Sequence, residues 1–404
     1  MSSPSAEAED ARWLAGLLGG DFLLWSPYIQ TEGFLHWQRI FATRTIPAST
    51  PIPLAEAADK IDPVYSYGGQ SRTVEDLIKV DYLSGLLVLK DGEVVLERYA
   101  RGLEPHRTWQ SSSMVKSLAS VLVGAALHDG YIDSLDELVI DHLPELKVNP
   151  AYDGVTLRHV LQMSSGTEFS EEYDDPESDV MEHYLRPIAQ RRPGVILEQR
   201  KVAKRQYEPG AHFHYNTGET FLLSLILSRA VGKTVADYCA ERIWKPMGME
   251  TDGYFMLDSD DGDEITGSCS GASLRDYARI GQLMANDGVA ANGERILPEG
   301  WVAESTAASS PNFDYVIWND VPGASFHGYG YLWWVLRPGV FMAVGFAGQW
   351  IVVVPEEGLV FVMLAALPQG PYVSPDEPLG QTAGNYLGTL ERVAFIDAVR
   401  AEVS

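Results

Sequence analysis

Positive charge is scarce in this chain. Lys and Arg together number 30, against 56 Asp and Glu, which gives a formal net charge of -26 at pH 7. A chain this acidic repels phosphate backbones and anionic lipid surfaces. The composition therefore excludes a nucleic-acid partner and a membrane partner, and leaves a small molecule as the expected one.

Cysteine is also scarce. The two cysteines, Cys239 and Cys269, lie far apart and have neither CxxC nor Cys/His ligand spacing. This pattern supports neither a disulfide framework nor a zinc site, so we expect two buried thiols. Nothing else in the sequence calls for a metal or an organic cofactor, and we expect none.

Long apolar runs and internal repeats are absent from the sequence as well. No stretch has the length and apolar character of a membrane-spanning helix. The first ten residues include Glu7, Glu9 and Asp10, whereas a secretory signal begins with basic residues and continues into a longer apolar run. We expect a cytoplasmic protein, although a periplasmic or secreted protein that had lost its signal would look the same.

The 404 residues, 46% of them hydrophobic, are enough for two domains or for one domain with a large insertion. Residues 85–90 and 93–99 flank Asp91-Gly92 and predict a β-hairpin. Three strands are expected near the other end, at 329–336, at 340–345 with a continuation at 350–354, and at 359–367, followed by a helix at about 383–403. A further helix is expected at 274–285.

These strands predict an α/β (α+β) fold with a five-stranded-type antiparallel sheet flanked by helices. Residues 1–128 and 266–404 would form the sheet domain. Residues 129–265, where helical patterns and long loops alternate, would form a mostly helical inserted domain. We expect the active site in the cleft between the two, and the oligomeric state stays open, with a homodimer as one candidate.

The segment Ser111-Ser112-Ser113-Met114-Val115-Lys116 leads into residues that are apolar on nearly every side, the pattern of an enclosed helix. Ser113 is the serine of this cluster that has Lys three positions later, on the same face of that helix. A serine hydroxyl needs a base to become a nucleophile, and a desolvated lysine can be that base. We therefore interpret Ser113 as a candidate nucleophile.

Two other segments could complete such a site. Tyr215 follows the Pro209-Gly210 turn and precedes a buried helix, so its phenol could share a proton with Lys116. Glycines interrupt the apolar strand in the segment 344–349, where a backbone N–H could complete an oxyanion hole.

With these segments together, residues 80–370 resemble the class C β-lactamase-like serine hydrolases, which include 6-aminohexanoate-dimer hydrolase and family VIII esterases and belong to the penicillin-binding protein/β-lactamase superfamily. The resemblance implies a β-lactamase/transpeptidase-like fold, Ser113 as nucleophile, Lys116 and Tyr215 as proton-transfer pair, and the N–H groups of Ser113 and Phe346 as oxyanion hole. The motifs that carry it are the Ser113 motif, Asp129-Gly130-Tyr131-Ile132, Leu161-Gln162-Met163-Ser164-Ser165-Gly166, the Tyr215 segment, Asp276-Tyr277-Ala278-Arg279, Tyr329-Gly330-Tyr331 with Trp333-Trp334, and Gly348-Gln349.

The sequence departs from the family pattern in two places. Many members carry Tyr-x-Asn in the second motif, but here Thr217 stands two positions after Tyr215. Thr217 would either bind substrate or Lys116, or lead the following helix as a cap. The third motif, Lys-Thr-Gly or His-Thr-Gly in lactamases and peptidases, is Gly345-Phe346-Ala347 here, so the cation and hydroxyl that would bind a substrate carboxylate are missing.

These features predict a serine hydrolase that acts on carboxylic esters or amides through an acyl-enzyme. The aromatic residues suggest a pocket for a hydrophobic or linear acyl group, and we expect five residues to bind substrate, namely Tyr173, Thr217, Trp333, Gly345 and Gln349. Two alternatives stay open. One is a β-lactamase or D-Ala-D-Ala carboxypeptidase, and the other is a non-catalytic ligand-binding member of the fold.

Overall fold

The computed structural model describes residues 25, 27–172, 175, 177–314, 326–367 and 390–403. Its centre is an eight-stranded sheet with the strand order β10-β11-β12-β13-β14-β5-β6-β2. The strands of this sheet are β2 (Ala55–Glu56), β5 (Leu83–Lys90), β6 (Glu93–Tyr99), β10 (Gly328–Tyr329), β11 (Trp334–Arg337), β12 (Val340–Gly345), β13 (Gln349–Val354) and β14 (Leu359–Ala365).

Both ends of the chain contribute to this sheet, as the sequence predicted. Strand β14 pairs antiparallel with β5, which places residues 359–365 beside residues 83–90. The five central strands β12, β13, β14, β5 and β6 are all antiparallel, and only the short edge strand β2 joins in parallel among the paired strands described. In the predicted hairpin, Asp91 and Gly92 both have positive φ, as a two-residue turn between twisted strands requires.

The C-terminal strands differ from the prediction in two places. Residues 350–354 do not continue strand 340–345, because Ala347 (φ 61°) and Gly348 (φ 90°) reverse the chain and β13 returns antiparallel to β12. The expected strand 329–336 is interrupted at Leu332 (φ 60°), so that β10 and β11 form separate antiparallel strands. In both places a left-handed residue breaks an apolar run that looks continuous in the sequence.

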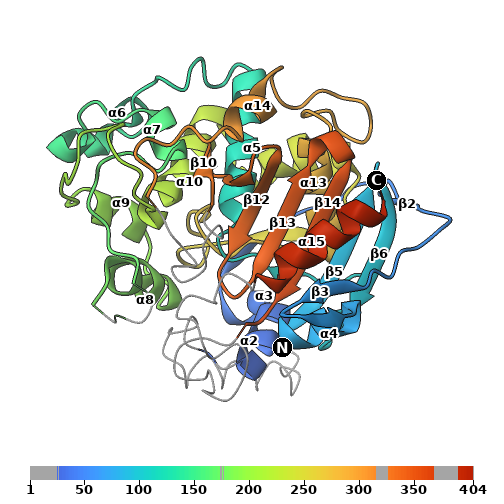
Figure 1. Cartoon of the computed structure of the whole chain (residues 1–404). Coiled ribbons are helices and arrows are strands. Elements are labelled where there is room, and N and C mark those ends of the chain that lie inside the picture. Colours follow the sequence, from blue (N-terminus) through green and yellow to red (C-terminus); the bar gives the residue numbers. More distant parts are fainter. Residues whose placement is uncertain are drawn as a thin grey trace, which may run out of the picture.

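Helices cover both faces of the sheet (Figure 1). Helix α13 (Leu274–Ala285), with the bounds that the sequence predicted, packs on β13, β14 and β5, and α5 (Met114–His128) packs on β12. Helix α15 (Glu391–Glu402) crosses the opposite face, where the Phe395 ring lies 6.4 Å from that of Phe361. The first part of the expected helix 383–403 falls outside the described residues.

Residues 129–265 contain helices joined by long loops, and most of these helices lie to one side of the sheet (Figure 1). The region also contains β8 (Gly253–Met256), which pairs with β1 (Thr43–Ile46) and β9 (Gly271–Ala272) in a second sheet that ends in β7 (Trp109–Gln110). The helices of this region are α6 (Val139–His142), η2 (Pro144–Val148), η3 (Pro150–Tyr152), α7 (Leu157–Leu161), η4 (Val180–Leu185), α8 (Arg186–Ala189), α9 (Val195–Arg200), α10 (Thr217–Val231), α11 (Val235–Cys239), η5 (Ala240–Trp244) and α12 (Lys245–Met247).

The remaining elements lie near the N-terminal end of the chain and between the main segments. They are α2 (Pro27–Leu35), α3 (Trp37–Ile40), β3 (Tyr65–Tyr67), β4 (Gln70–Arg72), α4 (Val74–Val80), α14 (Trp301–Ser305) and η6 (Pro355–Glu357). Within the described part of the chain, no helix is long and apolar enough to cross a membrane.

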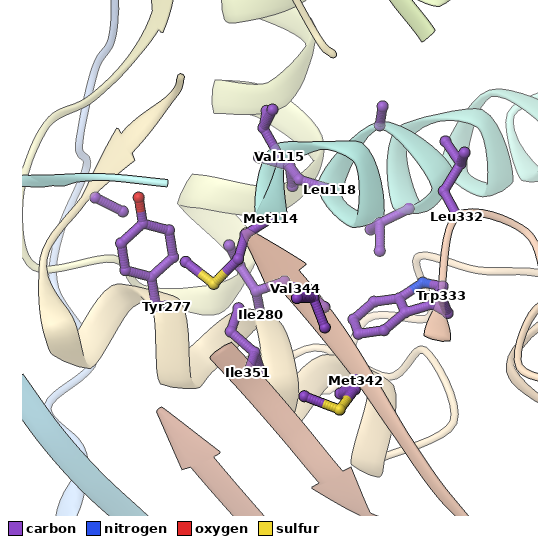
Figure 2. Packing of buried hydrophobic residues seen from close by; sticks show 14 of the residues in the cluster. Met114, Val115, Leu118, Tyr277, Ile280, Leu332, Trp333, Met342, Val344 and Ile351 are labelled. Carbon is purple, nitrogen blue, oxygen red and sulfur yellow. The ribbon is translucent and has the colours of Figure 1, made fainter. Parts of the chain in front are cut away.

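The core continues from the sheet into α5. Figure 2 shows Met114 and Leu118 of α5 beside Val344 of β12 and residues of α13 and β13. Residues 114–126 of α5 are all buried, so this helix is enclosed on every side as its composition predicts. The N-terminus of α5 is therefore held rigidly between the sheet and the helical region.

Candidate active site

Ser113 immediately precedes α5 and follows a tight turn from β7. The turn depends on Ser112, which has φ 46°, a left-handed conformation that costs energy for a residue with a side chain. The Gln110 amide holds Ser112 in place, because its oxygen accepts from the Ser112 N–H at 2.6 Å and its nitrogen donates to the Ser112 hydroxyl at 3.0 Å.

The segment 267–270 holds the same turn through hydrogen bonds to Ser111 and Ser112. The Ser111 N–H donates to the Ser270 carbonyl at 2.8 Å, and the Cys269 N–H donates to the Ser112 carbonyl at 3.1 Å. The Ser111 hydroxyl also accepts from the Ser270 N–H at 3.0 Å. These bonds fix the backbone that leads into Ser113, and α5 begins directly after it.

Lys116 lies one turn into α5 and is 2% exposed. Its Nζ donates to Ser113 Oγ at 2.8 Å and also donates to the Gly267 carbonyl. Burial lowers the Lys116 pKa to about 8, although the negative charge of Glu171 opposes this shift. A lysine with this pKa is partly neutral near physiological pH and can accept a proton from the serine.

Tyr215 lies near both Lys116 and β11. The Lys116 Nζ is 5.1 Å from the centre of the Tyr215 ring, and the ring stacks with Trp334 at 5.6 Å between centroids and 26° between planes. The structure thus brings together all three predicted catalytic side chains from α5 and from the loop before α10.

Thr217 does not cap α10, which was one of the roles expected for it. The N-cap of α10 is Asn216, whose side-chain oxygen accepts from the Glu219 N–H at 3.2 Å. Thr217 is the first residue of α10, and both its N–H (2.9 Å) and its hydroxyl (2.5 Å) donate to the Glu171 carboxylate. This carboxylate therefore occupies the N-terminus of α10, where the helix dipole favours negative charge.

A buried polar network lies below the Tyr215 loop. The Arg200 guanidinium pairs with Glu219, and their side chains are 3% and 0% exposed. Thr167 accepts from Arg200 at 2.6 Å and donates to Glu219 at 2.7 Å, and the Asn216 amide donates to the Thr167 hydroxyl at 3.1 Å. The network joins α9 and the loop after α7 to the residue that follows Tyr215.

The end of β12 brings Gly345 and Phe346 to the Ser113 turn. A Cβ at Gly345 would lie 2.3 Å from the Ser111 carbonyl oxygen, so only glycine allows the strand to approach this closely. Phe346 follows at the start of the turn into β13 and is 6% exposed. The backbone of this turn thus lies next to the backbone that carries Ser113.

Two of the expected substrate-binding residues, Trp333 and Gln349, are buried in the core. Trp333 is 0% exposed and lies among the buried hydrophobic residues (Figure 2), with its ring 5.3 Å from that of Phe341. The next residue, Trp334, stacks on Tyr215 instead. Gln349 is also 0% exposed. Its amide nitrogen donates to Phe346 O, and its amide oxygen accepts from Trp109 Nε1. Tyr173 falls outside the described residues.

Glu171 is a member of the site that was not predicted. It begins an acidic stretch of the sequence, residues 171–179, and nothing in that stretch signals that one of its carboxylates turns inward to α10. Two basic residues of the stretch 191–205 pair with carboxylates, Arg191 with Asp260 at 2.7 Å and Lys204 with Glu168 at 3.8 Å. Both cysteines are free and buried, as predicted.

Comparison with known proteins identifies the family of the chain. Residues 72–383 match the Beta-lactamase family. The chain is 26% identical over 342 residues to the 6-aminohexanoate-dimer hydrolase of Paenarthrobacter ureafaciens, covering 83% of this chain and 85% of that protein.

Two solved structures show the same fold. A Bacillus anthracis protein proposed to be a 6-aminohexanoate-dimer hydrolase superposes with a TM-score of 0.75 at 22% identity, covering 93% of each chain. A family VIII carboxylesterase superposes with a TM-score of 0.54 at 16% identity, covering 79% of this chain and 92% of that one.

The chain therefore belongs to the Beta-lactamase family. It is a serine hydrolase of the β-lactamase fold.

Proposed function

We propose that Ser113 is the nucleophile of this hydrolase and that it forms an acyl-enzyme with carboxylic esters or amides. The observation that carries the proposal is the 2.8 Å contact between Lys116 Nζ and Ser113 Oγ, at a lysine that burial has brought to a pKa of about 8. A serine with a buried, partly neutral lysine at hydrogen-bond distance is an activated nucleophile.

The reaction would proceed in two stages. Ser113 Oγ attacks the carbonyl carbon while Lys116, with Tyr215 beside it, accepts the hydroxyl proton. The N–H groups of Ser113 and Phe346 stabilise the negative oxygen, and the proton returns to the leaving alcohol or amine. Water then attacks the acyl-enzyme by the same proton path and releases the acid.

The third-motif segment Gly345-Phe346-Ala347 supports esters or amides over β-lactams and D-Ala-D-Ala peptides. It offers neither a cation nor a hydroxyl to a substrate carboxylate. The similarity to a 6-aminohexanoate-dimer hydrolase supports a linear amide among the substrates, and the similarity to a carboxylesterase supports an ester.

The test is hydrolysis of p-nitrophenyl esters, of the linear 6-aminohexanoate dimer and of nitrocefin by the native protein and by Ser113→Ala and Lys116→Ala. Ester or amide turnover that is lost in both variants is expected, with nitrocefin turned over weakly or not at all. Ser66→Ala and Lys79→Met, which change exposed residues, are the matched controls and should keep the native rate. Turnover that survives Ser113→Ala would disprove the assignment.

A further inference from the structure

The turn between β12 and β13 carries Phe346, and each of its carbonyl groups has a partner. Gly345 O accepts from the Gly348 N–H at 3.2 Å, and Ala347 O accepts from the Leu367 N–H at 3.1 Å. Phe346 O accepts from Gln349 Nε2 at 3.0 Å. Gly348 O accepts from Arg392 Nη1 at 2.7 Å.

These bonds determine the direction of the Phe346 N–H. The peptide group between Gly345 and Phe346 is planar and trans, so the Phe346 N–H points opposite to the Gly345 carbonyl. That carbonyl is directed by its bond to Gly348, and Gly348 is in turn held by Arg392. Arg392 therefore acts on the Phe346 amide through one intervening residue and does not approach the Ser113 hydroxyl itself.

Arg392 is well placed to hold this turn rigidly. It lies in the first turn of α15, is 0% exposed, and pairs with Asp81, which is also 0% exposed and precedes β5. The guanidinium carbon lies 4.8 Å from the centre of a ring of Trp350. A Cβ at Gly348 would lie 2.7 Å from Arg392 Nη2, so the guanidinium fills the space beneath this glycine.

We propose that Arg392 is a positioning residue of the oxyanion hole, fixing the 345–348 turn so that the Phe346 N–H faces the reacting carbonyl. The proposal rests on the proposed function, in which Phe346 supplies one of the two oxyanion donors. A buried charge pair is costly to desolvate, and its place behind this turn gives it a structural task that a packed apolar pair could not perform. The planar guanidinium can bond Asp81 and Gly348 at once, whereas a lysine ammonium is a single point of charge.

The test compares Arg392→Lys with Arg400→Lys. Arg392→Lys keeps the positive charge opposite Asp81 but cannot hold both partners. Arg400 lies on the same helix and pairs with Glu357 far from the turn, so it is the matched control. If Arg392→Lys does not fold, the double variant Asp81→Asn/Arg392→Gln replaces the ion pair with neutral hydrogen-bonding groups and carries the same test.

Two readouts are made on each variant. The first is steady-state kinetics, where we expect kcat to fall about 10- to 100-fold with KM changed less than about twofold, because the donor serves the transition state. The second is hydrogen–deuterium exchange of the peptide 345–350, which should exchange faster while the peptide 109–118 exchanges as in the native protein. Arg400→Lys should match the native protein in both.

The two readouts separate this inference from the proposed function. Unchanged exchange of 345–350 in a folded Arg392 variant would overturn the role of Arg392, as would a native kcat. Equal exchange increases at 345–350 and 109–118 would overturn it too, since they would mean general loosening. Faster exchange confined to 345–350, in a protein whose native form hydrolyses neither esters nor amides, would support the positioning of the turn and reject the proposed function.

Discussion

Lys116 carries an ionisable amine but is only 2% exposed, a combination that is rare in proteins because burial removes water from the charge. Its ammonium loses hydration on burial, and in return it gains the Ser113 hydroxyl and the Gly267 carbonyl as partners. The structure therefore holds a lysine that is easily deprotonated beside the Ser113 hydroxyl, where the proposed function requires a proton acceptor. This has a direct consequence for the dependence of the rate on pH.

We predict that kcat/KM for an uncharged ester rises with pH and reaches half of its plateau at about pH 8, the pKa of Lys116. Below that pH the amine is protonated and cannot accept the Ser113 proton; above it the neutral form predominates. A pH–rate profile from pH 6 to 10, corrected for spontaneous hydrolysis, measures this. A flat profile over that range would show that Lys116 is not the base in the rate-determining step.

Glu171 should shift that midpoint. Its carboxylate stabilises the protonated form of Lys116, so Glu171→Gln should lower the Lys116 pKa and move the rising limb to lower pH. The measurement is again the pH–rate profile, with Glu171→Asp retaining most of the native midpoint. Glu172→Gln removes the same charge from the exposed neighbour and should leave the profile unchanged. A midpoint that stays at its native value in Glu171→Gln would contradict the electrostatic role.

At the scale of helices and strands, the sequence best predicts those elements whose pattern lies within a few neighbouring residues. Helix α13 has the predicted bounds because its apolar residues recur at helical spacing, and the β5–β6 hairpin follows from Asp91-Gly92. Ser113 and Lys116 were found for the same reason, since three residues separate them. Glu171 and Arg392 were not, because their partners lie 46 and 311 positions away in the sequence.

The buried ion pair between Arg200 of α9 and Glu219 of α10 allows a prediction about the stability of the region that carries the Tyr215 loop. Arg200→Met should leave the Glu219 carboxylate buried without its cation and lower the free energy of unfolding by about 3–5 kcal/mol. Arg200→Met/Glu219→Gln should recover a large part of this loss, because it removes the unpaired charge. Urea unfolding measures both, and Arg229→Met, which breaks the more exposed Arg229–Glu145 pair on α10, should cost less than about 1 kcal/mol. A loss of that smaller size in Arg200→Met would show that the pair stabilises little.

At the scale of the whole molecule, the net charge of -26 acts on every charged substrate that approaches. Long-range repulsion lowers the rate at which an anion reaches the site, and dissolved salt screens this effect over a distance of about 10 Å at 0.1 M. An uncharged ester of the same size and leaving group feels no such field. The comparison between the two substrates therefore isolates the field of the molecule from the chemistry at Ser113.

We predict that kcat/KM for a p-nitrophenyl ester with a free carboxylate is lower than for its uncharged methyl-ester analogue at low ionic strength, and that added NaCl narrows the difference. The missing third-motif cation acts in the same direction, since no positive group in the segment 345–347 attracts the carboxylate once it has arrived. The two contributions can be separated, because salt screens the distant field of the surface more strongly than a contact inside the site. The part of the difference that persists at 0.5 M NaCl therefore reports the pocket, and the part that disappears reports the net charge. Equal rates for both esters at low salt would mean that positive groups near the site cancel the field of the chain.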